Sequence, residues 1–128
     1  MTQNEAVAHW QKRARAELKA ARILFEKGEN DVYGEVIFHC HLAVELAFKA
    51  QYIQERDEAA PFTHNLGELA HMLDHAWSEN DQKDFDRLND HAVLSRYGDC
   101  EWYIRNATKE NAAMWLKKAE KFLSQIQS

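Results

Sequence analysis

Apolar side chains recur at intervals of three and four residues along almost the whole chain, and only one proline and four glycines interrupt its 128 residues. This spacing gathers the apolar side chains on one face of a helix, because an α-helix turns once in about 3.6 residues. No segment shows the alternation of apolar and polar residues that is typical of a β-strand. We therefore expect an all-α fold, an up-and-down bundle of four to five helices.

Breaks in this pattern divide the sequence into five helical segments. The first ends at Gly28, a residue well suited to the left-handed conformation that follows many helices. Asn30 or Asp31 is expected to cap the second segment, which continues for about seven turns. Pro61, which lacks a backbone N–H, then closes the connection to the third segment.

The other three segments begin at residues whose side chains are able to cap a helix. Glu68 lies three residues after the first of these caps, as in a capping box. The apolar face of that segment extends to Ala76, and the next segment ends near Arg96. The expected caps are Asn65, then Ser78 or Asn80, and finally Thr108.

The length and the charge of the chain limit its organisation and its partners. At 128 residues we expect one domain over residues 1–128, large enough to form its own hydrophobic core. With 16 basic and 21 acidic residues, the net charge of −5 lacks the basic excess that drives non-specific binding to duplex nucleic acid. Any contact with a nucleotide or RNA must therefore depend on a few basic residues at one site and not on the overall charge.

Two features of the sequence favour a cytoplasmic protein. Cys40 and Cys100 lie far apart and belong to no CxxC or zinc-type pattern, which is typical of reduced thiols. The N-terminus lacks the apolar core of a signal peptide, and no run approaches the roughly 18 apolar residues of a membrane helix. We therefore expect no association with a membrane.

A polar stripe is the most informative feature of the second segment. On a helical wheel, His41, Glu45 and Lys49 follow one another every four residues, with Tyr52 one step along. Apolar residues on both sides of this stripe place the helix at the centre of the bundle. The stripe is either a solvent-exposed strip with a Glu45–Lys49 ion pair or a polar groove that faces a ligand or a partner.

Histidines in the third segment raise the question of a metal site. Glu68 and His71 have the Glu-x-x-His spacing of helical di-iron proteins, and His75 lies one turn after His71. Such bundles need a second Glu-x-x-His pair, and no other glutamate has a histidine three residues later. We therefore expect no metal and no cofactor. A serine or cysteine hydrolase is also disfavoured, because its nucleophile follows a strand.

Three stretches of the sequence together resemble the HEPN domain family. They are "FHCHLAVELAFKAQYIQ", which contains a His-x-Ala-x-Glu-x-x-x-Lys pattern, then "THNLGELAHML", and then "LSRYGD". Their order and separation are similar to those of the family, and the resemblance extends from about Trp10 to Ile126. It implies a small helical bundle, often dimeric, that acts beside a minimal nucleotidyltransferase in a toxin–antitoxin-like pair or as a ribonuclease toxin.

The resemblance also implies a position for the last of these stretches. Arg96 and Tyr97 would lie at the mouth of a cleft between the second and fourth helices, with Asp99 capping or orienting the turn. Gly98 departs from the family pattern, in which proline is common at this position, and would make the turn more flexible.

The side chains assigned to this cleft have chemistry suited to a nucleotide. Arg96 offers a planar set of donors for phosphate oxygens, and Tyr97 offers a ring that stacks on a base. Lys49 would add a point charge, and His64 would lie near a positive helix end. Alternatively, Arg96 only complements the helix dipole and Tyr97 only packs. The expected ligand-binding residues are Arg96, Tyr97, Asp99, Lys49, Glu45, His41 and His64.

The chain lacks the motif that the ribonuclease members of the family carry. In those members a histidine follows an arginine after four to six intervening residues and moves protons during cleavage. No arginine of this sequence has a histidine at that spacing, and Arg87 and His91 have only three residues between them. We therefore expect a non-catalytic protein. The alternative is a toxin that cleaves RNA without a metal through Arg87 and His91.

Two further aromatic residues follow Gly98 in the sequence. Trp102 and Tyr103 lie within six positions of Tyr97, among polar neighbours that indicate partial exposure. They either pack in the core or form an interface, because tryptophan and tyrosine are enriched at interface hot spots. We expect a homodimer, with a nucleotidyltransferase protein and a nucleotide or RNA as the further partners.

Overall fold

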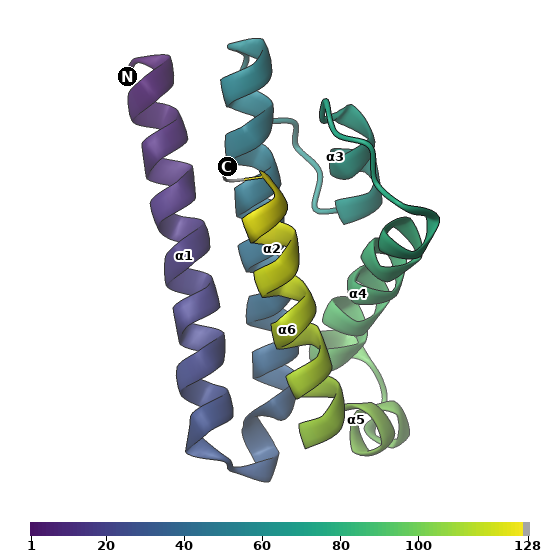
Figure 1. Ribbon diagram of the computed structural model, residues 1–128. Coiled ribbons are helices and arrows are strands. Elements are labelled where there is room, and N and C mark those ends of the chain that lie inside the picture. The colour runs from purple at the N-terminus through teal and green to yellow at the C-terminus, as the bar shows by residue number, and fades with distance from the viewer. Residues whose placement is uncertain (127–128) are drawn as a thin grey trace.

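The structure is a computed structural model that describes residues 1–126, and its regular elements are helices (Figure 1). The expected all-α bundle is confirmed. No helix within these residues combines the length and the apolar character needed to cross a membrane. The elements are α1 (Gln3–Lys27), the 3₁₀ turn η1 (Asn30–Val32), α2 (Tyr33–Arg56), α3 (Leu66–Met72), α4 (Glu79–Tyr97), α5 (Cys100–Asn106) and α6 (Lys109–Ile126).

α2 is the central helix of the bundle. α1 and α6 run alongside it, while α4 crosses it at an angle and α3 packs beside α4 (Figure 1). Every residue from Ala43 to Ala50 is buried, the charged ones included. A helix that is covered on all sides has no single apolar face, which explains why its sequence shows a polar stripe between two apolar faces.

Aromatic residues form the core where α2, α4 and α6 meet. Phe48, Phe85, Trp115 and Phe122 are fully buried. The Phe85 ring centroid lies 5.3 Å from that of Phe48 and 4.7 Å from that of Phe122. Contacts of this kind stabilise a core beyond the burial of apolar area alone. They hold α4 against α2, and these two helices form the walls of the cavity described below.

Most helix boundaries lie where the sequence predicts them. Gly28 follows α1 in the left-handed conformation, with a φ of 74°. α4 ends at Tyr97, next to the expected Arg96. The confirmed caps, each of which accepts a hydrogen bond from the backbone N–H three residues later, are Asn65, Ser78 and Thr108.

Two boundaries differ from the prediction. No side chain within residues 1–126 caps α2, so neither Asn30 nor Asp31 has the expected role, and the chain enters the helix through η1 instead. α3 stops before reaching Ala76. The Trp77 indole N–H donates to the Ala70 carbonyl at 3.2 Å, which takes the place of a continuing helix hydrogen bond.

α5 is a short helix that the apolar pattern does not predict. Asp99 caps it, because its Oδ1 accepts a hydrogen bond from the Trp102 N–H at 2.8 Å. None of the seven residues of α5 is buried, so the segment has no apolar periodicity to detect. The described part of the chain therefore has six α-helices, against the four to five expected.

Candidate ligand-binding cavity between α2 and α4

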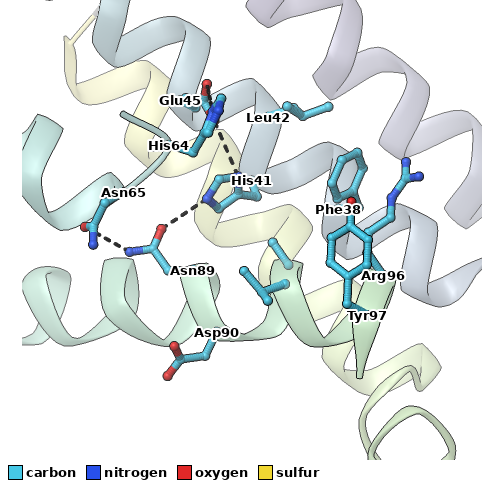
Figure 2. Close-up of a pocket in the computed structure, with 12 residues that line it drawn as sticks. Phe38, His41, Leu42, Glu45, His64, Asn65, Asn89, Asp90, Arg96 and Tyr97 are labelled. Atoms are coloured by element: carbon cyan, nitrogen blue, oxygen red, sulfur yellow. Dashed lines mark hydrogen bonds and ion pairs between the residues drawn. The ribbon is translucent and has the colours of Figure 1, made fainter. Parts of the chain in front are cut away.

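A cavity of about 560 Å³ lies between α2 and α4, and residues just before α3 close one end of it (Figure 2). This volume falls within the range of small-molecule sites. The residues that line it are Phe38, His41, Leu42 and Glu45 of α2, His64 and Asn65 before α3, and Asn89, Asp90, Ala92, Val93, Arg96 and Tyr97 of α4.

The polar stripe of α2 is buried beside this cavity. The exposed fractions of His41, Glu45 and Lys49 are only 7%, 4% and 7%. Glu45 Oε2 accepts hydrogen bonds from Lys49 Nζ at 3.1 Å and from His64 Nδ1 at 3.0 Å. The interpretation of the stripe as a solvent-exposed strip is therefore wrong, although the expected Glu45–Lys49 ion pair is present.

A hydrogen-bond network fixes the orientation of the Asn89 side chain. Its Oδ1 accepts from the Leu66 backbone N–H at 3.0 Å, and its Nδ2 donates to Asn65 Oδ1 at 3.1 Å. Asn65 Oδ1 in turn accepts from the Glu68 N–H as the cap of α3. Since Asn89 Oδ1 is an acceptor, His41 Nε2, which lies 3.0 Å from it, carries the proton and donates.

The other nitrogen of His41 faces a carboxylate oxygen. Burial lowers the pKa of His41 below its ordinary value, although the hydrogen bond to Asn89, the charge of Glu45 and the backbone of His64 oppose this. A neutral His41 with its proton on Nε2 has a free lone pair on Nδ1. Glu45 Oε1 lies 3.8 Å from that Nδ1 and has no hydrogen-bond partner among the residues described.

We call His41, Glu45 and His64 the acceptor end of the cavity, and Phe38, Arg96 and Tyr97 its arginine end. Figure 2 shows the two groups on opposite sides of the site. At the acceptor end, Glu45 Oε1 is buried and has no donor within residues 1–126, and the Nδ1 of a neutral His41 is a second acceptor 3.8 Å from it. A buried acceptor without a donor is costly, because neither water nor protein compensates for its lost hydration.

The arginine end is more open. The Arg96 Cζ atom lies 3.8 Å from the centroid of the Phe38 ring, which is a close cation–π contact. Its Nη2 lies 3.6 Å from Glu35 Oε2, and both side chains of this pair are partly exposed, so the ion pair is weak. Tyr97 is 84% exposed. The donors of Arg96 are therefore accessible to an anion at the mouth of the cavity.

The turn after Arg96 and Tyr97 is fixed by a hydrogen bond to α4 before it and by the cap of α5 after it. The Gly98 N–H donates to the Leu94 carbonyl at 2.9 Å, which a proline at this position would be unable to do. A Cβ atom on Gly98 would lie 2.4 Å from the same carbonyl oxygen, so a larger residue would displace the end of α4. Asp99 then begins α5 as its cap. Glycine thus sets the position of the arginine end.

The structure brings five of the seven expected ligand-binding residues to the cavity. They are His41, Glu45, His64, Arg96 and Tyr97. Lys49 instead contacts Glu45 from the far side and lines a separate hollow beside Trp10. Asp99 caps α5 and does not line the cavity.

Sequence reasoning missed Phe38 and Asn89, which contribute to the two ends of the site. Asn89, Val93 and Arg96 follow one another at intervals of four and three residues, so they share one face of α4. Phe38 lies one turn before His41 on α2. These spacings were the only sign in the sequence that Asn89 and Phe38 belong to the site. A phenylalanine in a helix is ordinarily interpreted as a core residue.

Arg87 and His91 lie outside the cavity and are engaged with other side chains. Arg87 pairs with Asp84 at 3.3 Å, and its Cζ lies 5.4 Å from the centroid of the Trp115 ring. His91 Nδ1 accepts a hydrogen bond from the Trp115 indole N–H at 3.3 Å. Burial, together with the charge of Arg87, lowers the pKa of His91. A neutral histidine in this tautomer contributes to packing around Trp115.

Trp102 and Tyr103 pack partly within the chain. The Trp102 ring meets the His91 ring edge to face, with 5.5 Å between centroids. The Tyr103 hydroxyl donates to the Asp31 carbonyl at 3.4 Å, and its ring lies so close to Gly34 that a Cβ there would be 2.7 Å from it. Both residues are half-buried, which gives them an intrachain role that the sequence left open.

The histidines do not assemble with acidic residues into a metal site. Among the residues that the structure describes, no three His, Cys, Asp or Glu side chains are arranged to hold a metal ion. Of the residues with di-iron spacing, His71 is exposed and His75 packs against Trp77, with the rings tilted by 46° and 4.2 Å between their centroids. Burial raises the pKa of the Cys40 thiol to about 12, so this thiol stays protonated in the core.

Comparisons with known proteins identify a family and a similar solved structure. The family model described as the HEPN domain matches residues 7–128. The crystal structure of TT1696 from Thermus thermophilus has a TM-score of 0.81 and 21% sequence identity, over 94% of this chain and 95% of that chain. At this level of identity, the likeness shows the fold alone. A comparison with curated proteins gave no match.

Proposed function

This chain belongs to the HEPN domain family, and we propose that it binds a nucleotide or an RNA end in the cavity between α2 and α4, without catalysing a reaction itself. The observation that carries the proposal is the accessible guanidinium of Arg96 at the mouth of a cavity with a polar far end. A cytoplasmic nucleotidyltransferase is the protein partner that we propose, in a toxin–antitoxin-like pair.

The chemistry of the cavity suits the parts of a nucleotide. A phosphate is able to displace the weakly held Glu35 carboxylate and to form charge-assisted hydrogen bonds with the planar guanidinium of Arg96. Leu42 and Val93 give the cavity apolar lining, which suits the faces of a base. Tyr97 adds an exposed aromatic ring at the mouth, on which the base of a neighbouring nucleotide in an RNA end is able to stack.

Replacement of Arg96 tests this proposal. In Arg96→Ala we expect nucleotide binding to weaken by about 1.5 to 3 kcal/mol, because a charge-assisted hydrogen bond is lost. Arg96→Lys should restore binding only in part, because an ammonium group does not reproduce the planar donor set. Calorimetric titration with AMP, GMP and short RNA oligonucleotides measures these affinities.

A matched control for this experiment is Arg105→Ala, which removes an exposed arginine that is paired with Glu101 on α5, outside the cavity. We expect its affinity for nucleotides to equal that of the wild type. If Arg96→Ala lowers the melting temperature while binding stays unchanged, Arg96 acts only on the helix dipole and on Phe38, and the proposal is wrong.

The surface beside the arginine end also suits contact with a second protein. Val93, Tyr97 and Ile104 are exposed apolar residues at or near the junction of α4 and α5. We propose that this surface takes part in a homodimer, as aromatic residues often do at interfaces. Light scattering should give a dimer mass that Tyr97→Ala shifts toward the monomer, whereas Ile23→Ala on α1 should leave it unchanged. A monomeric wild type at tens of micromolar would contradict the dimer.

The alternative function, RNA cleavage by Arg87 and His91, has less support. Arg87 already contacts Asp84 and Trp115, His91 accepts a hydrogen bond from Trp115, and the spacing of the pair is shorter than the family motif requires. We expect pure protein to leave structured and unstructured RNA intact. Cleavage that His91→Ala abolishes would instead establish this pair as catalytic.

A further inference from the structure

Two atoms at the acceptor end of the cavity are hydrogen-bond acceptors that face no donor. Asn89 Oδ1 already accepts from Leu66 N–H, so the proton of a neutral His41 is on Nε2 and not on Nδ1. Glu45 Oε1 is buried and has no partner within residues 1–126, whereas Glu45 Oε2 accepts from Lys49 and His64. Two acceptors, Nδ1 and Oε1, thus lie 3.8 Å apart with no donor between them.

A group that donates two hydrogens, one to each acceptor, satisfies both of them at once. A separation of 3.8 Å allows one nitrogen or oxygen to lie within about 2.9 Å of each acceptor, the usual length of a hydrogen bond. An acceptor such as a carbonyl oxygen would be repelled by the same pair. The site therefore selects for donors, because a wrong partner leaves buried polar groups unpaired.

The length of the cavity indicates which donor of a nucleotide reaches this point. Phe38, which lies under Arg96, and Glu45 are seven residues apart on α2, a rise of about 10 Å along the helix. In a nucleoside monophosphate the ribose hydroxyls lie close to the phosphate, and the far edge of the base is the most distant part. A phosphate on Arg96 therefore places the base edge, and not the ribose, at the acceptor end.

We propose that Glu45 Oε1 and His41 Nδ1 recognise the exocyclic amino group of a nucleobase, so that the cavity prefers amino-bearing bases over their analogues without this group. This inference rests on the proposed function, since it takes the ligand to be a nucleotide with its phosphate on Arg96. The His64 ring, 85% exposed at its side chain and bonded to Glu45 Oε2, covers the carboxylate on the outer side.

Matched ligand pairs test the inference. AMP differs from purine riboside 5′-monophosphate only by its 6-amino group, and GMP differs from IMP only by its 2-amino group. We expect calorimetry with the full chain to show at least tenfold tighter binding of the amino-bearing member in one of the two pairs. Equal affinities within both pairs would overturn the inference and leave the proposed function intact.

The isosteric variant Glu45→Gln tests whether Glu45 causes the preference for amino-bearing ligands. Lys49 and His64 both donate to the position of Oε2, so the amide oxygen of a glutamine stays there and its NH₂ group takes the position of Oε1. The site then presents a donor in place of an acceptor, and we expect the preference for the amino-bearing ligand to disappear. A preference that persists in Glu45→Gln would refute the assignment to Glu45.

The two proposals fail in different ways. If no nucleotide binds to the wild type, both the proposed function and the amino-group inference are wrong. If nucleotides bind and Arg96→Ala weakens them, but the matched pairs are equal, only the inference is wrong. A melting curve of Glu45→Gln shows whether the variant is folded at the temperature of the titration. Should it unfold, the wild-type ligand pairs still decide the inference.

Discussion

The two ends of the cavity differ in how firmly the rest of the molecule holds them. At the acceptor end, His41 and Glu45 are buried, and hydrogen bonds connect them to Lys49, His64 and Asn89. At the arginine end, Arg96 rests on one aromatic ring and forms one long ion pair. Both ends contain charged or titratable side chains, yet only His41 and Glu45 of the acceptor end are part of the folded core.

This difference separates the roles of polar residues in the fold from their roles in binding. A buried polar network is costly to break, because every unpaired group retains its desolvation penalty. An exposed arginine contributes little to stability but keeps its donors available for a ligand. Substitutions at the acceptor end should therefore change stability first, whereas substitutions at the arginine end should change binding first.

Asn89→Ala should have the largest effect on stability. It leaves the His41 Nε2–H and the Leu66 N–H without an acceptor, so we expect a loss of about 2 to 4 kcal/mol in the free energy of unfolding. Urea denaturation measures this loss. Asn80→Ala, an exposed position on the same helix, is the control and should stay within about 0.5 kcal/mol of the wild type. Similar values for the two variants would contradict a structural role for the network.

Gly98→Ala should have a smaller effect on stability and a clear effect on the arginine end. The added Cβ would lie 2.4 Å from the Leu94 carbonyl oxygen, so the last turn of α4 has to shift and carry Arg96 with it. We expect a loss of about 1 to 3 kcal/mol in the free energy of unfolding, together with weaker nucleotide binding. Denaturation and calorimetry on the same preparation measure both effects.

Gly67→Ala provides the comparison for that variant. A Cβ on Gly67 would meet the Asp86 carboxylate at 2.8 Å, and this is the end of an exposed side chain that is able to swing away. Its next contact, with Asn65 Oδ1 at 3.3 Å, requires only a small shift. Its free energy of unfolding should change by less than about 1 kcal/mol. Equal losses in the free energy of unfolding for Gly98→Ala and Gly67→Ala would mean that the Leu94 carbonyl does not prevent a side chain at position 98.

Acid should destabilise the fold through two histidines, His41, which is buried, and His91, which is half-buried. The pKa values of His41 and His91 lie below the ordinary value of 6.5, so the unfolded chain binds more protons than the folded one as the pH falls below 6.5. The free energy of unfolding should therefore decrease between about pH 7 and pH 5.5, by less than about 1.4 kcal/mol per pH unit for each histidine. Denaturation curves over this range measure the slope, and His41→Gln should reduce it. Stability that rises on acidification would contradict the neutral state of His41.

The sequence predicts the helices of this fold well, because each buried face repeats with the helical period. It fails for α5, where seven residues without a buried side chain leave no such pattern. It also fails at the start of α2, where η1 replaces a side-chain cap. Boundaries of this kind depend on local backbone geometry, which tertiary packing decides.

The candidate site is predictable only in part for a related reason. The stripe of His41, Glu45 and Lys49 is visible on a helical wheel, but the wheel does not show that every side of α2 is covered. The hydrogen bonds of Asn89 join α4 to the start of α3, and no spacing within one helix reveals such a contact. Burial and contacts between helices are properties of the assembled bundle.

The most direct test of the central claim is to observe both ends of the cavity while a nucleotide binds. Nitrogen-resolved NMR of side chains during an AMP titration reports on His41 Nδ1 and Arg96 Nε at the same time. We predict that both signals shift with one common dissociation constant, while those of Arg87 and His91, outside the cavity, remain unchanged. Shifts at Arg87 and His91 with none at His41 and Arg96 would contradict the account.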